Sequence, residues 1–212
     1  MPAPPSLARE VRKYEGRASV DTTSGRPVIR GHAIVFNAPS LVIRGWAGGF
    51  QEIIRPQAIQ RTLKEKIDLR AFYDHDPGRI LGRLSAGTLR TSVDQRGLKI
   101  EIDPHPDIRE HTDLMRLIER GDVTGMSFAF ETDRDWQDWD TATDPPTRYI
   151  NDMRVLEVSV VSMPAYEQTD VEVGMRSMRS ALGVANLDQR RAALDARAER
   201  WKKELAMLRA KR

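Results

Sequence analysis

Residues 121–130 read Gly121-Asp-Val-Thr-Gly-Met-Ser-Phe-Ala-Phe130, a pattern that predicts a half-buried strand carrying a serine. Side chains of a strand alternate between its two faces. Met126, Phe128 and Phe130 therefore share an apolar face, and Ser127 lies on the opposite face. Because the apolar face anchors the strand, it holds the serine hydroxyl rigidly. Ser127 is our candidate nucleophile.

A histidine that could act as the base lies 52 positions before this serine. A serine hydroxyl is a weak nucleophile at neutral pH and needs such a base. In Phe72-Tyr-Asp-His-Asp-Pro-Gly78, His75 ends an apolar alternating run. Histidines at strand ends are most often structural, so its pairing with Ser127 is a hypothesis. The same run allows a divalent metal site formed by Asp74, His75 and Asp76, which would need further ligands from elsewhere in the chain.

A carboxylate interrupts a second apolar strand. The residues that alternation places on one face are Met153, Val155, Glu157, Ser159 and Val161. An unpaired buried carboxylate is costly, so Glu157 needs a cationic or hydrogen-bonding partner. With His75 as that partner, Ser127, His75 and Glu157 would form a set of nucleophile, base and orienting group. The alternative partner is an arginine such as Arg70, Arg83 or Arg148.

Short strands and two helices account for most of the region before residue 162. The predicted strands cover residues 26–36, 50–54, 68–73, 80–84, 88–93, 98–102 and 148–161, together with the Ser127 strand within 121–130. One helix begins at Pro56; a second begins with a capping box of Asp107 and Glu110 and ends at Gly121. Asp94-Gln-Arg-Gly97 predicts a hairpin closed by a left-handed glycine, and 133–146 predicts a long exposed loop. The pattern indicates an α+β domain, mainly β and barrel-like.

The composition excludes several kinds of site. The chain has 212 residues, of which 40% are hydrophobic, 31% are charged and none is cysteine. Disulfides, thiolate zinc sites and cysteine nucleophiles are therefore excluded. No segment approaches the roughly 20 apolar residues that span a bilayer, and the first residues do not resemble a secretory signal. We expect a cytoplasmic protein without a membrane segment, and no motif predicts a cofactor or a metal.

The positive charge is concentrated at the C-terminal end. Residues 176–212 contain 11 Lys and Arg against four Asp and Glu, whereas residues 1–175 contain 23 against 27. Leucines and Trp201 recur there at helical spacing, so 176–212 is predicted to be a basic helical tail. Its mixed charges favour a solvated helix face over a nucleic-acid site. We therefore expect a flexible segment over 1–24, a domain over 25–175 and this tail.

Three motifs together resemble the prohead (capsid maturation) protease family of tailed phages. They are Tyr73-Asp-His-Asp76 with Gly82-Arg83, the stretch 121–130, and Glu157-Val-Ser-Val-Val161 followed by Pro164-Ala-Tyr166. They occur in the family's order within about residues 25–175. The resemblance implies a serine endopeptidase with an assemblin-like β-barrel and surrounding helices. It also implies that the enzyme is enclosed in the precursor shell, cleaves the scaffold or the scaffold-like part of the capsid protein, and cleaves itself.

The resemblance also implies roles for individual residues. His75 matches the family's general base and Ser127 its nucleophile. The assemblins have a second histidine as third member, which this sequence lacks, and Glu157 is the acidic residue on the corresponding strand. They also stabilise the oxyanion with an arginine-bearing loop. Here that loop has no arginine, so the backbone N–H of Ala165 or Tyr166 is the expected donor.

The expected partners are the major capsid protein, the scaffold protein and further copies of the chain itself. The expected location is the host cytoplasm, inside the procapsid, with the gene carried by a phage or a prophage. A non-catalytic capsid assembly protein with the same fold is the main alternative, which replacement of Ser127 would distinguish. A metal-dependent hydrolase using Asp74, His75 and Asp76 is a third hypothesis, which a chelator would test.

Overall fold

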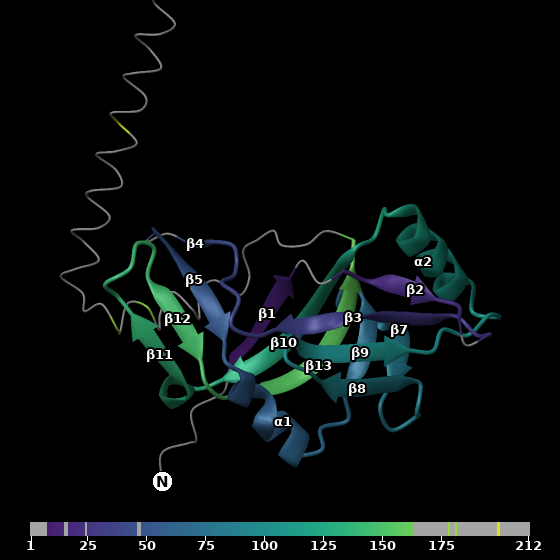
Figure 1. Cartoon of the computed structure of the whole chain (residues 1–212), viewed down its shortest axis with the longest axis horizontal. Coiled ribbons are helices and arrows are strands. Elements are labelled where there is room, and N and C mark those ends of the chain that lie inside the picture. Colours follow the sequence, from purple (N-terminus) through teal and green to yellow (C-terminus); the bar gives the residue numbers. More distant parts are fainter. Residues whose placement is uncertain are drawn as a thin grey trace, which may run out of the picture.

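The computed structural model describes residues 8–14, 17–23, 25–45 and 48–162 and the single residues 178, 181 and 199. Apart from these three single residues, the predicted helical tail lies outside the described part of the chain, as do the expected oxyanion donors Ala165 and Tyr166. The described strands form three sheets, with two short helical segments and one longer helix beside them, so the structure is mainly β, as predicted. Figure 1 shows the helix α2 (Arg109–Arg120) at one end of the molecule.

Each sheet combines strands from distant parts of the chain. The largest has the order β1 (Ala8–Tyr14), β10 (Gly125–Thr132), β13 (Arg154–Val161), β6 (Arg70–Tyr73) and β7 (Asp76–Arg83). The second has the order β2 (Ser19–Asp21), β3 (Val28–Val35), β9 (Gly97–Ile102) and β8 (Leu89–Val93). The third has the order β11 (Gln137–Asp140), β12 (Thr147–Ile150), β5 (Gly48–Ile54) and β4 (Ile43–Gly45).

The predicted β-barrel does not close among the described strands. Strands β1 and β7 are the two edges of the five-stranded sheet, and they do not pair with each other. The other eight described strands form two further open sheets. Alternating apolar residues are needed wherever one face of a sheet is buried, so the sequence pattern is the same for open and closed sheets.

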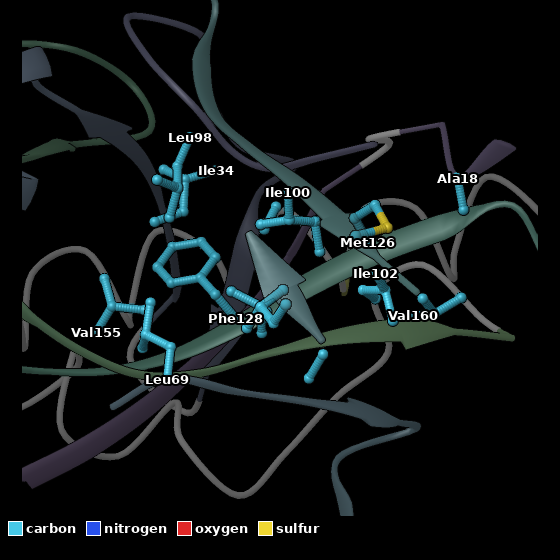
Figure 2. Packing of buried hydrophobic residues seen from close by; sticks show 14 of the residues in the cluster. Ala18, Ile34, Leu69, Leu98, Ile100, Ile102, Met126, Phe128, Val155 and Val160 are labelled. Carbon is cyan, nitrogen blue, oxygen red and sulfur yellow. The ribbon is translucent and has the colours of Figure 1, made fainter. Parts of the chain in front are cut away.

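The largest sheet buries one face against β3 and β9, and this contact forms the main core. Met126, Phe128 and Phe130 of β10 have no exposed surface, which confirms the predicted apolar face of this strand. They pack in one cluster with residues of the second sheet such as Ile34 and Leu98 (Figure 2). The core therefore anchors the strand that carries Ser127.

The helices differ in detail from the prediction. The first begins at Pro56 as predicted, as a 3-10 turn (Pro56–Ile59) followed by α1 (Gln60–Lys64). The second, α2, ends at Gly121 in the left-handed conformation, with φ of 81°. The predicted capping box does not form, because the N-cap is Ile108 and the Glu110 carboxylate binds Arg79 of β7 instead.

Two predictions in the second half of the chain are wrong. The predicted loop 133–146 contains a 3-10 turn (Arg134–Trp136) and β11, which pairs with β12 and packs Trp139 against Phe50. The predicted strand 148–161 is two strands, β12 and β13, in different sheets. The chain leaves one sheet for the other where the backbone N–H groups of Asn151 and Asp152 donate to the Trp136 carbonyl.

The β8–β9 hairpin forms as predicted, but glycine is needed at position 97 for a reason other than a left-handed turn. Asp94 closes the turn, because its carboxylate accepts the backbone N–H groups of Arg96 and Gly97. Gly97 is not among the described glycines with positive φ. A Cβ at this position would lie 1.8 Å from the carbonyl oxygen of Ile34. Glycine is therefore required here by the close approach of β3.

The N-terminal segment expected to be flexible contributes β1 and β2 to two of the sheets. A buried group of four charges ties β1 to the third sheet. Arg148 of β12 binds Glu10 at 2.7 Å and Glu52 of β5 at 2.9 Å, and Arg12 binds Glu52 at 2.8 Å and also Glu10. Burial raises the pKa of Glu10, but Arg148 and Arg12 outweigh this effect and lower it to about 2. Such charges are tolerated because each has an opposite partner.

Candidate active site

His75 lies in the two-residue turn that joins β6 to β7. Tyr73 pairs with Asp76, so Asp74 and His75 are the two central residues of the hairpin. Their φ angles are 51° and 62°, both in the left-handed region. A two-residue hairpin of this type favours glycine or asparagine, and a histidine there is strained. The strain indicates that the imidazole, rather than turn formation, determines the residue at this position.

Asp74 fastens this turn to the end of β13. Its carboxylate accepts hydrogen bonds from the backbone N–H of Ser162 at 2.9 Å and from the Ser162 hydroxyl at 3.1 Å. Its own backbone N–H donates to the carbonyl of Val160 at 2.9 Å. The turn is therefore held from both its side chain and its main chain, which fixes the position of His75.

A bulge in β13 places Glu157 on the face opposite the core. Ala129 of β10 pairs with Glu157, but the next residue, Phe130, pairs with Val155, so Leu156 is an extra residue on β13. Val155 lies in the main core cluster, and beyond the bulge Glu157 and Ser159 lie on the face of Ser127. The prediction that Val155 shares the face of Glu157 and Ser159 is thus wrong, because a bulge adds one residue to one strand and reverses the alternation.

The three candidate residues from β10, the β6–β7 turn and β13 meet on this face. His75 Nε2 lies 2.7 Å from Ser127 Oγ, and His75 Nδ1 lies 2.6 Å from Glu157 Oε1. A carboxylate only accepts hydrogen bonds, so Nδ1 carries the proton and Nε2 is left to accept the serine proton. The imidazole therefore links a hydroxyl to a carboxylate in the order that a nucleophile, a base and an orienting group require.

Ser127 has a second acceptor on β1. Its hydroxyl donates to the backbone carbonyl of Arg12 at 2.9 Å, and Lys13 of β1 is its partner in the sheet. The hydroxyl has one proton, so Nε2 and the Arg12 carbonyl compete for it. Ser127 is fully buried, whereas the side chain of His75 is 16% exposed. The site is thus open to solvent on the histidine side.

The alternative in which Asp74, His75 and Asp76 bind a metal does not match the contacts of these three side chains. The carboxylate of Asp76 accepts the backbone N–H of Gly78, while Asp74 binds Ser162 and His75 binds the candidate nucleophile. The three side chains of the hypothetical metal site thus have three separate partners. No group of His, Asp and Glu within the described ranges is arranged to hold a metal ion.

Two of the three arginines suggested as partners of Glu157 bind elsewhere. Arg83 pairs with Asp68, and Arg148 belongs to the buried charge group. The cation nearest to the carboxylate is Arg9 of β1, whose Nη2 lies 3.4 Å from Oε1. Its side chain is 52% exposed, so this ion pair is weak. Arg9 was not among the expected partners, because β1 was not predictable from the sequence.

The sequence model of the family described as caudovirus prohead serine protease matches residues 12–182. Among solved structures, the chain is similar to the bacteriophage T4 capsid assembly protease gp21, with 10% identity and a TM-score of 0.46. That match covers 72% of this chain and 96% of the other. No curated protein matches the sequence.

The family match spans β10, β13 and the β6–β7 turn, and so includes every candidate residue of the described site. No helix in the described part of the chain is long and apolar enough to cross a membrane. The match extends over most of the 212 residues. The chain therefore belongs to the caudovirus prohead serine protease family, and it is a protease of the kind that acts in capsid maturation.

Proposed function

We propose that the chain is a serine endopeptidase in which Ser127 is the nucleophile, His75 the general base and Glu157 the orienting carboxylate. The observation that carries the proposal is the imidazole of His75 between Ser127 Oγ at 2.7 Å and Glu157 Oε1 at 2.6 Å. Both distances lie within hydrogen-bonding reach, and proton transfer requires such reach. Membership in the prohead protease family supports the reaction class.

In the proposed reaction, the Ser127 hydroxyl leaves the Arg12 carbonyl and donates to His75 Nε2. Oγ then attacks the scissile carbonyl carbon while Nε2 accepts the proton. The same nitrogen returns this proton to the leaving amine as the peptide bond breaks. Water attacks the acyl-enzyme in a second cycle through His75 and regenerates the serine. Throughout the reaction, the Glu157 carboxylate accepts a hydrogen bond from His75 Nδ1–H and so stabilises the imidazolium.

The tetrahedral intermediate needs a donor for its oxyanion. We propose the backbone N–H of Ala165 or Tyr166, which follow the end of β13 in sequence. Ser162, the last described residue before them, is held by Asp74 next to the turn of His75. A preorganised backbone donor is sufficient for this role, and its loss typically costs about 10²–10³ in rate.

The proposed substrate is the scaffold protein or the scaffold-like part of the major capsid protein, together with the protease itself. The family's role in prohead maturation supports this choice. The reaction would take place in the host cytoplasm, inside the precursor shell. We also propose that the domain is related to the assemblins in fold.

Co-expression with the major capsid protein of the same phage or prophage tests this function. Mass spectrometry of purified shells should show shortened capsid or scaffold chains with the wild-type protease and full-length chains with Ser127→Ala. Ser85→Ala is a matched control, because Ser85 is an exposed serine remote from the site. Normal processing by a well-folded Ser127→Ala protein would refute the serine-protease assignment.

We further propose that 25–175 is the core of the protease domain, that β1 docks onto it from the segment 1–24, and that 176–212 is a separate basic helical tail. The stripe of Leu187, Leu194, Trp201 and Leu208 would pack on scaffold or capsid protein during assembly. Deletion of 176–212 should preserve cleavage of a peptide in solution and lower the number of protease copies per shell. Equal incorporation of the two forms would rule out this role for the tail.

A further inference from the structure

The second oxygen of the Glu157 carboxylate has its own buried donor. The Ser159 hydroxyl donates to Glu157 Oε2 at 2.7 Å, while Oε1 faces His75 Nδ1. Ser159 has no exposed surface, and Glu157 is 4% exposed. The carboxylate is therefore held at both oxygens, by groups on opposite sides of it.

We infer that Ser159 is a positioning residue for the proposed catalytic set. It fixes the plane of the Glu157 carboxylate so that Oε1 points at His75 Nδ1. This inference rests on the proposed function, because the orientation matters only if His75 acts as a base. Ser159 itself contacts no reacting atom, so its effect on catalysis would pass through Glu157 and His75.

Strand geometry explains why residue 159 can fill this role. Residues i and i+2 of a strand share a face, so Glu157 and Ser159 lie on the same face of β13 beyond the bulge. Ser159 also pairs with Ser127 of β10 on one side and with Phe72 of β6 on the other. It therefore lies between the strand of the nucleophile and the strand that leads to the turn of His75.

Ser159 places a polar hydroxyl at a fully buried strand position. A hydroxyl without a partner is costly in the interior, and a small apolar residue would suit a buried strand position better. At Ser159 the cost is offset by a charge-assisted hydrogen bond, a strong type of contact. The other described contact that could orient Glu157 is Arg9, at 3.4 Å and half exposed, which is too weak to fix the carboxylate.

The test uses three variants of the full-length chain. Ser159→Ala removes the hydroxyl, and Ser159→Thr keeps it. Thr132→Val is the matched control, because Thr132 is buried on β10 and its hydroxyl donates one hydrogen bond, to the Asp152 carbonyl. Each variant is compared with wild type in kcat and KM for a capsid-derived peptide, in unfolding free energy, and in the proton NMR signal of the His75 Nδ1–H.

Ser159→Ala should lower kcat between about tenfold and a hundredfold with KM unchanged, since a small misplacement of a catalytic group has effects of this size. It should also shift or broaden the Nδ1–H signal. Ser159→Thr should restore most of kcat and the signal, and Thr132→Val should change only stability. Wild-type kcat and an unchanged signal in Ser159→Ala, or a loss that Ser159→Thr does not restore, would overturn the inference. The NMR comparison needs no substrate, so it tests Ser159 even if Ser127→Ala shows the proposed function to be wrong.

Discussion

The Asp74 carboxylate accepts both the backbone N–H and the hydroxyl of Ser162, 88 positions further along the chain. This contact joins the turn of His75 to the end of the strand that carries Glu157. The proposed base and the proposed orienting group are therefore held together by this contact, although they come from distant segments. Positioning of this kind makes a proton transfer site effective without movement of the backbone.

Asp74→Ala should lower both stability and activity. It removes a half-buried acceptor and places alanine in the left-handed region, with a combined cost of about 2 kcal/mol. Asp74→Asn should be much milder, because asparagine tolerates this conformation and its carbonyl can accept the Ser162 N–H. Chemical denaturation and a peptide cleavage assay measure the two effects, with Asp76→Ala on the same turn as control. Equal losses in the alanine and asparagine variants would argue against the contact.

His75→Gly and His75→Ala should both be inactive but should differ in stability. Both lose the same hydrogen bonds to Ser127 and Glu157. At a φ of 62°, glycine avoids a steric cost that alanine retains, so the glycine variant should be more stable by about 1 kcal/mol. Urea unfolding of the two proteins measures this difference. If alanine proves as stable as glycine, position 75 is not strained.

Glu157→Gln should retain more activity than Ser127→Ala or His75→Ala, by about tenfold or more, because an orienting group forms no covalent bond. The amide can present its oxygen to His75 Nδ1, and Ser159 can then accept from the amide nitrogen, since a hydroxyl is both donor and acceptor. Measured kcat values decide the order. Wild-type activity in Glu157→Gln would mean that another group orients the imidazole.

Acid should weaken the attachment of β1 to the third sheet. The pKa of Glu10 is lowered from 4.5 to about 2, so its contribution to stability is complete above about pH 4.5 and is lost as the pH falls toward 2. The difference in unfolding free energy between wild type and Glu10→Gln should therefore shrink over this interval. Glu119→Gln, at an exposed position of α2, serves as control. A difference that stays constant with pH would show that the Glu10 carboxylate is not held in this way.

The sequence was sufficient to predict the strands whose apolar residues alternate. Strand β10 is the clearest case, because Met126, Phe128 and Phe130 lie in the core and Ser127 lies on the other face. Strand β1 was not predictable in this way. Its sequence is Ala-Arg-Glu-Val-Arg-Lys-Tyr, and its core-facing residues Glu10 and Arg12 are charged. Charges can line a buried face only when partners such as Glu52 and Arg148 arrive from other strands, and local sequence does not reveal them.

The three candidate residues of the site could be named from the sequence, but the contacts that hold them in position could not. Ser127, His75 and Glu157 were singled out by the alternation of their strands and the chemistry of their side chains, and the three motifs that resemble the family then pointed to the same residues. The roles of Asp74 and Ser159 depend on contacts with Ser162 and with the carboxylate, which become visible only in three dimensions. The bulge at Leu156 was also hidden, because an extra residue in a strand leaves the apolar composition unchanged.

The central claim is that His75 activates Ser127 as a nucleophile, and active-site labelling tests it most directly. An organophosphorus fluoride forms a stable ester with a serine hydroxyl that a neighbouring histidine has activated. Peptide mass spectrometry of the labelled full-length protein should find the phosphoryl group on Ser127, and His75→Ala should abolish the modification while the protein stays folded. Labelling at another serine, or equal labelling of Ser127 in wild type and His75→Ala, would contradict the account.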